Sequence, residues 1–205
     1  MSAEAIDMVS PDTSIHPRWV RVCHWINALA ILVMIGSGWQ IYNASPLFGF
    51  TFLGSITLGG WLAGALLWHF AAMWVLVVNG VVYVTLGIAT GRFRRKLLPI
   101  RPAEVVADVK AALTFKLAHD DLSHYNAVQK VLYSGVILAG IVIVLSGLSI
   151  WKPVQFQELT TLFGGYDIAR YVHFLAMSAI VGFLIVHVTL ALIVPKSLRA
   201  MITGR

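Results

Sequence analysis

Four histidines lie in the apolar part of this 205-residue chain. His173 and His187 are fourteen residues apart in one hydrophobic stretch, and His24 and His69 lie in the stretches before it. Fourteen residues make about 3.9 turns of α-helix, so this pair shares one face of a helix and is separated by roughly 21 Å along its axis. Because an imidazole is costly to bury in lipid without a partner, histidines at two depths predict two stacked metal centres.

The elements that must position these histidines are membrane spans. The composition is 59% hydrophobic and only 12% charged, and no Asp, Glu, Lys or Arg occurs between Val22 and Gly91. Turn residues around Pro46 and several glycines divide that region into two spans rather than three. We therefore predict an all-α integral membrane protein, a single domain over residues 1–205, with four spans of sufficient length. The predicted spans are residues 22–42, 61–90, 131–151 and 171–194.

The basic residues predict the orientation of these spans. Four spans place thirteen of the fifteen Lys and Arg side chains on one side of the membrane and only Lys152 and Arg170 on the other. Basic loops stay in the cytoplasm, so both termini are expected there. The pI of about 9.7 then reflects loops lying against anionic lipid and gives no reason to expect nucleic acid. Residues 1–17 are expected to be a cytoplasmic tail, and residues 92–128 a cytoplasmic loop with an amphipathic helix that includes Val105, Val109 and Leu113, with Phe115 or Leu117 next.

Under this topology the histidines pair by depth. His24 and His187 both lie toward the inner side, whereas His69 and His173 both lie toward the outer side. Two bis-histidine b-type haems account for this pattern best, with His24 and His187 on the inner iron and His69 and His173 on the outer iron. Zinc is disfavoured because no carboxylate or second cysteine lies near either pair. The single cysteine, Cys23, excludes covalent attachment through a C-x-x-C-H motif.

Other residues carry weaker expectations. Glycines at Gly36, Gly38, Gly135, Gly140 and Gly147 could leave room for a haem plate between helices. Haem propionates need donors, for which the candidates are Arg18, Arg21, Lys130 and Lys196 on the inner side and Lys152 and Arg170 on the outer side. His16, His119 and His124 lie in polar segments and are expected at the surface. No internal repeat is visible.

The order of these residues resembles the bacterial four-helix di-haem cytochromes b, often grouped as cytochrome b561-like. That family includes the cytochrome b subunits of nickel–iron hydrogenases, formate dehydrogenases and thiosulfate reductases. The matching segments are Arg21-Val-Cys-His24-Trp25, Trp61 with His69, Tyr125-Asn-Ala-Val-Gln-Lys130, Ser146-Gly147-Leu148, and His173 with His187. The resemblance covers nearly the whole chain and implies the same pairing of histidines.

The resemblance also implies a quinone site on the inner side, with Asn126 as the candidate and Gln129 as a weaker one. A quinone carbonyl needs a hydrogen-bond donor in an apolar cleft. Asn126 could instead cap the third span, or do both. Ubiquinone or menaquinone is the expected mobile substrate.

Together these features predict a cytochrome that carries electrons across the membrane between a periplasmic redox partner and the quinone pool. Iron with two axial histidines has no open position, which favours electron transfer over oxygen chemistry. One alternative is a stand-alone superoxide:quinone oxidoreductase of the same fold, although Glu158 and Asp167 offset the positive charges of the outer loop. A second alternative is a haem-free membrane anchor or small transporter.

Overall fold

Four long helices form the body of the protein. The computed structural model describes residues 16–113 and 125–204. Within these ranges the long helices are α1 (Arg18–Ala44), α2 (Leu62–Ala89), α5 (Ala127–Trp151) and α7 (Tyr166–Ile193). Each is long and apolar enough to cross a membrane, and much of each surface exposes large aliphatic side chains such as Leu67 and Leu192. The prediction of an all-α fold with four membrane-spanning helices is confirmed.

Capping and turn residues determine where the third and fourth long helices begin. The third long helix starts at Ala127 rather than at the predicted residue 131, because Asn126 and Gln129 form a capping box that supplies partners for its first amide groups. The fourth starts at Tyr166 rather than at 171. It follows Gly164 and Gly165, whose φ angles of 84° and 102° suit glycine and turn the chain sharply.

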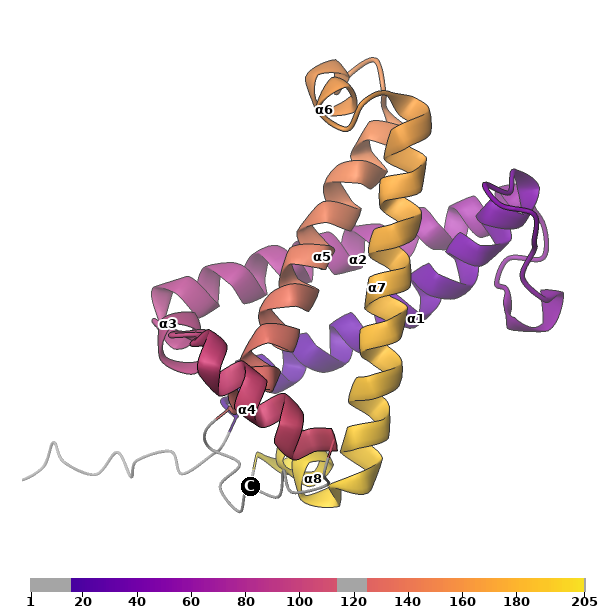
Figure 1. Cartoon of the computed structure of the whole chain (residues 1–205). Coiled ribbons are helices and arrows are strands. Elements are labelled where there is room, and N and C mark those ends of the chain that lie inside the picture. The colour runs from indigo at the N-terminus through magenta and orange to yellow at the C-terminus, as the bar shows by residue number, and fades with distance from the viewer. Residues whose placement is uncertain (1–15, 114–124, 205) are drawn as a thin grey trace, which may run out of the picture.

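The long helices form two hairpins. The first pairs α1 with α2 and the second pairs α5 with α7, and each pair is in extensive contact. Figure 1 shows the two hairpins crossing one another. Contacts between hairpins are sparser than contacts within them. In the first hairpin, the buried Asn79 of α2 donates hydrogen bonds to the Cys23 carbonyl (2.8 Å) and to Asn27 Oδ1 (2.7 Å) of α1. Such bonds stabilise helix pairs in lipid.

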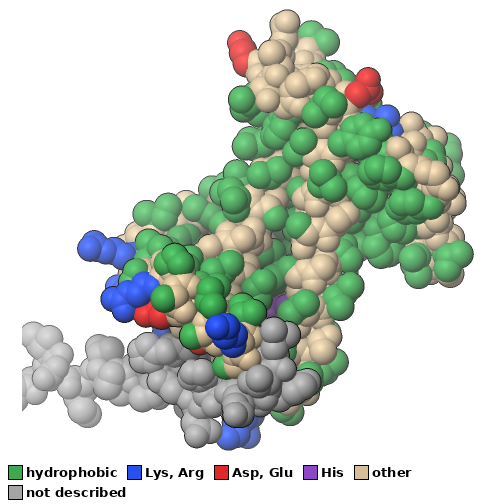
Figure 2. All heavy atoms as spheres, in the orientation of Figure 1, with side chains coloured by type: hydrophobic (Ala, Val, Ile, Leu, Met, Phe, Trp, Pro, Cys, Tyr) green, Lys and Arg blue, Asp and Glu red, His purple; other side chains and the backbone are tan. Residues whose placement is uncertain are grey.

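Short helices gather at one end of the bundle: α3 (Arg92–Leu97), α4 (Pro102–Leu113) and α8 (Pro195–Thr203). Figure 2 shows Lys and Arg side chains clustered over this end and hydrophobic side chains over the long helices. The amphipathic helix predicted between residues 92 and 128 is α4, while Phe115 and Leu117 lie outside the described residues. Whether this end faces the cytoplasm remains a prediction.

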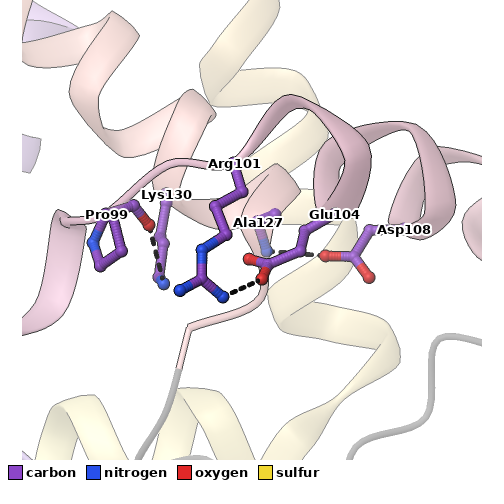
Figure 3. Close-up of polar contacts among 6 residues, drawn as sticks. All are labelled: Pro99, Arg101, Glu104, Asp108, Ala127 and Lys130. Carbon is purple, nitrogen blue, oxygen red and sulfur yellow. Dashed lines mark hydrogen bonds and ion pairs between the residues drawn. The ribbon is translucent and has the colours of Figure 1, made fainter.

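Two polar contacts attach α4 and the residues before it to the start of α5, and a third is local to the start of α4 (Figure 3). Asp108 Oδ2 accepts a hydrogen bond of 2.7 Å from the Ala127 amide. Lys130 Nζ donates to the Pro99 carbonyl (3.3 Å), and Arg101 pairs with Glu104 at 3.0 Å. The α4 segment is thereby held against the beginning of the third long helix.

The opposite end carries the 3₁₀ turn η1 (Gly54–Ile56) and the short helix α6 (Gln157–Leu162). Here Arg170 Nη2 at the start of α7 donates to the Ser45 carbonyl (2.6 Å) and to Ser45 Oγ (3.1 Å). Tyr42 packs against Phe174, with ring centres 5.2 Å apart. These contacts join the two hairpins at this end of the bundle.

Candidate haem-binding site

His24 of α1 and His187 of α7 face each other across the two hairpins. Their ring centres are 6.0 Å apart and their planes are inclined by 63°. We call them the α1–α7 pair. His24 is six residues after the start of α1 and His187 is six residues before the end of α7, so the pair lies toward the end that carries α8.

His69 of α2 and His173 of α7 form a second pair, the α2–α7 pair. Their ring centres are 6.5 Å apart and their planes are inclined by 62°. Each histidine is seven residues after the start of its helix, so this pair lies toward the end that carries α6. The structure thus brings together the same residues that the depth argument paired. Each pair joins one hairpin to the other.

The separation within each pair suits an iron between two imidazoles. A bond from a metal ion to an imidazole nitrogen is about 2 Å long, so two rings on opposite sides of one ion have centres about 6 Å apart. Rings stacked directly on one another would have centres closer together than those of these pairs. An ordinary hydrogen bond would join two ring nitrogens about 3 Å apart, which leaves no room for an ion between them. The residues present therefore fit a bis-histidine haem at each pair.

Two buried serines lie beside the α2–α7 pair. Ser37 Oγ of α1 is 3.0 Å from His69 Nδ1, and Ser146 Oγ of α5 is 3.1 Å from His173 Nδ1. From the sequence, Ser37 and Ser146 were small residues that could leave room for a haem, and Ser146 was part of the family resemblance; neither was predicted to contact a histidine. A Ser-Gly dipeptide occurs on both of the helices that have no histidine at this depth, α1 and α5. That shared dipeptide could have pointed to the serines, but two residues are too few to be recognised as an internal repeat.

The glycines after these serines make room for the imidazole rings. A Cβ atom at Gly38 would lie 3.4 Å from His69 Cε1, and one at Gly147 would lie 3.2 Å from His173 Cε1. By contrast, a Cβ atom at Gly135 or Gly140 would meet nothing within 4 Å. Gly38 and Gly147 therefore let the helix backbone approach the imidazole rings of His69 and His173.

Asn126 and Gln129 cap α5. Asn126 Oδ1 accepts from the Gln129 amide (2.7 Å), and Gln129 Oε1 accepts from the Asn126 amide (3.1 Å). Among the described residues, no hydrogen bond is recorded for either side-chain nitrogen. A capping role is thus present for both residues, and each retains donor atoms for a further partner.

Most of the basic candidates have other contacts. Arg21 donates to the Ile202 carbonyl of α8 (2.8 Å), and Lys130 and Arg170 donate to the backbone as described above. Lys152 Nζ lies 5.2 Å from the centre of the Trp151 ring. These contacts give each residue a structural role at its end of the bundle.

The prediction of a surface position for His16 is wrong. His16 is buried, with its Nδ1 3.3 Å from Arg92 Nη2. Burial and the charge of Arg92 lower the pKa of His16 to about 4, so it is neutral at pH 7. The polar residues around His16 indicated a surface position. The contact with Arg92 could not be predicted from the sequence because it joins residues 76 positions apart. His119 and His124 lie outside the described residues.

Known proteins are similar to this chain over nearly its whole length. The family described as prokaryotic cytochrome b561 matches residues 15–204. A protein of Azospira oryzae named putative protein-methionine-sulfoxide reductase subunit YedZ1 is 53% identical over 191 residues, which cover 93% of this chain and 96% of that protein.

Substitution of Gly147 tests whether this glycine makes room for the His173 ring and so for haem binding at the α2–α7 pair. We expect Gly147→Val to displace the His173 ring and to remove about half of the bound haem, because only the α2–α7 pair is affected. Gly135→Val on the same helix is the matched control and should keep the full haem content. Haem counted per purified chain distinguishes them, and equal haem content in both variants would contradict the assignment.

Proposed function

Because the chain belongs to the prokaryotic cytochrome b561 family, we propose that it binds two b-type haems and carries electrons between a quinone and an extracytoplasmic reductase. Membership establishes a membrane haem protein of the cytochrome b561 type. The observation that carries the finer proposal is the pair of facing imidazoles at each of two depths, 6.0 and 6.5 Å between ring centres.

The protein's own residues would hold the haems and set their environment. His24 and His187 would hold one haem, and His69 and His173 would hold the other. When bound, the haems supply one-electron redox chemistry. With two histidines holding each iron, the site would favour electron transfer over binding of a substrate at the metal. The apolar helices exclude water around both pairs.

The donor of electrons is proposed to be a quinol bound beside Asn126. Asn126 begins α5 at the end of the bundle toward which the α1–α7 pair lies. Its amide nitrogen can donate to a quinone carbonyl while its oxygen continues to cap the helix. Oxidation of the quinol releases two electrons and two protons. The clustered basic residues at this end support a cytoplasmic position for both termini in a bacterial inner membrane.

The acceptor is proposed to be a reductase of methionine sulfoxide. The relative from Azospira oryzae is named as a putative subunit of such an enzyme, and it matches this chain over almost its whole length. Reduction of one methionine sulfoxide consumes two electrons and two protons and yields methionine and water. The two half-reactions therefore balance one quinol against one sulfoxide. The partner would dock at the end that carries α6, near the α2–α7 pair.

The structure gives less support to a stand-alone superoxide oxidase. A small anion is attracted by a positive funnel, but Arg170 already donates to Ser45 and Lys152 lies against Trp151. Glu158 and Asp167 lie in the same region of the chain. The charges of this end do not converge on an open site.

Removal of one ligand from each pair tests the pairing. We expect purified wild-type protein to hold two low-spin b haems per chain, and His24→Ala and His69→Ala to hold one each. The reduced-minus-oxidised spectra of the two variants should add up to that of the wild type, since the pairs use separate ligands. Loss of the same spectral component in both variants would refute the pairing, and a colourless wild-type protein would refute haem binding.

Electron delivery to the partner can be followed by the reoxidation of the haems. We expect pre-reduced protein to be reoxidised anaerobically only when a purified methionine-sulfoxide reductase and a peptide that contains methionine sulfoxide are both present. The same peptide with unoxidised methionine is the control. Reoxidation without the reductase would contradict the proposed acceptor. Reduction of the oxidised haems by superoxide would instead favour the stand-alone superoxide:quinone oxidoreductase.

Substitutions of Asn126 separate quinone binding from helix capping. Asn126→Asp keeps a capping oxygen but, when ionised, has no side-chain donor, whereas Asn126→Leu removes both at a cost in stability of about 1 kcal/mol. We expect both variants to keep two haems and to slow haem reduction by a soluble quinol about tenfold. A normal rate in Asn126→Asp with a slow rate in Asn126→Leu would assign Asn126 to the cap alone.

A further inference from the structure

Each histidine of the α2–α7 pair lies against one fully buried serine from a neighbouring helix. Ser37 and Ser146 both have no exposed surface. Ser37 is on α1, beside His69 of α2, and Ser146 is on α5, beside His173 of α7. The two serines therefore belong to different hairpins, and each contacts the histidine of its own hairpin.

The hydrogen bonds of these serines fix the direction of the contact. Ser37 Oγ is 2.6 Å from the Val33 carbonyl, and Ser146 Oγ is 2.7 Å from the Val142 carbonyl. A carbonyl can only accept, and a hydroxyl has one proton, so each serine donates to its own helix four residues back. Each serine oxygen must then accept from the neighbouring histidine, which places a proton on Nδ1.

A second acceptor at His173 leads to the same tautomer. His173 Nδ1 also lies 3.0 Å from the Ile143 carbonyl, which has no proton to offer. A neutral imidazole with its proton on Nδ1 has its lone pair on Nε2. Both histidines of this pair are thereby prepared to bind a metal through Nε2.

The glycine after each serine completes the arrangement. Gly38 and Gly147 allow the helix backbone to approach the Cε1 atom of the same ring that the preceding serine contacts. The two-residue unit Ser-Gly therefore has the same function on α1 and on α5. It supplies an acceptor for Nδ1 and space for the ring.

The α1–α7 pair has a different environment. In the part of the chain that the structure describes, no ring nitrogen of His24 or His187 has a hydrogen-bond partner. Its neighbours are aromatic: Trp25 meets the His24 ring edge-on with centres 5.2 Å apart, and Phe183 stacks on His187 at 5.4 Å and 11°. Hydroxyl acceptors are thus a property of the α2–α7 pair.

We propose that Ser37 and Ser146 are positioning residues that hold the Nδ1–H form of His69 and His173, aim Nε2 at the iron and lower the reduction potential of the haem at this pair. An acceptor on Nδ1–H makes the imidazole a stronger electron donor and so favours the more positive, oxidised iron. The inference rests on the proposed haem binding. It goes further because it assigns serine acceptors that lower the reduction potential to the haem of the α2–α7 pair and not to the haem of the α1–α7 pair.

The test uses the holoprotein with Ser37→Ala, Ser146→Ala and the double substitution. Redox titration followed by the visible spectrum gives one midpoint potential per haem, and electron paramagnetic resonance reports ligand orientation at each iron. We expect two haems per chain in each variant. The haem of the α2–α7 pair should shift to a more positive potential, most in the double variant, and its resonance should move. The other haem should keep both values.

Two further variants distinguish positioning from packing. Ser149→Ala is the matched control, because Ser149 is equally buried on α5 and, among the described residues, its hydroxyl bonds only to the Leu145 carbonyl of its own helix (3.1 Å). Ser37→Thr keeps the hydroxyl and should keep the wild-type potential. An unchanged potential in both Ser37→Ala and Ser146→Ala, or an equal shift in Ser149→Ala, overturns the proposal while leaving haem binding intact. Absence of haem from the wild-type protein overturns both.

Discussion

The cost of placing imidazoles in hydrocarbon governs the arrangement of this protein. Each of the four histidines lies within a helix that is otherwise apolar, where a polar ring without a partner is expensive. The fold brings the four rings together in two facing pairs, so that each ring has a polar neighbour. Two of the four rings also have a serine hydroxyl as a partner for Nδ1. A metal bound at Nε2 would satisfy the remaining polar atom of each of these rings.

The two-hairpin architecture follows from the same requirement. Close packing within each hairpin is possible because small residues such as Gly38 and Gly147 lie where one helix meets a ring on the next. Packing between the hairpins is looser, and both histidine pairs cross that boundary. The family match adds that such a bundle is a haem protein. The two histidine pairs thus lie at the boundary between the hairpins, where helix–helix contacts are sparser than within each hairpin.

The sequence was sufficient for the fold and for predicting which histidine rings face each other. Charge and hydropathy predicted four spans, and helix direction predicted which histidines meet at one depth. It was insufficient where contacts depend on side-chain direction between distant segments. Ser37 and Ser146 looked like ordinary small residues of membrane helices, and the buried contact between His16 and Arg92 joins segments far apart in the chain. For Asn126 the cap is visible in the structure, whereas a ligand role depends on a molecule that binds there.

Because α7 contributes one histidine to each pair, the interval between the two sites is a property of a single continuous helix. His173 and His187 are separated by a fixed number of backbone hydrogen-bonded turns, and this interval does not depend on how the hairpins cross. Loosening of the junction between hairpins would separate the two rings of each pair but would leave the spacing of the pairs along α7 unchanged. The length of one helix therefore fixes the distance between the two pairs, whatever moves at either end of the bundle.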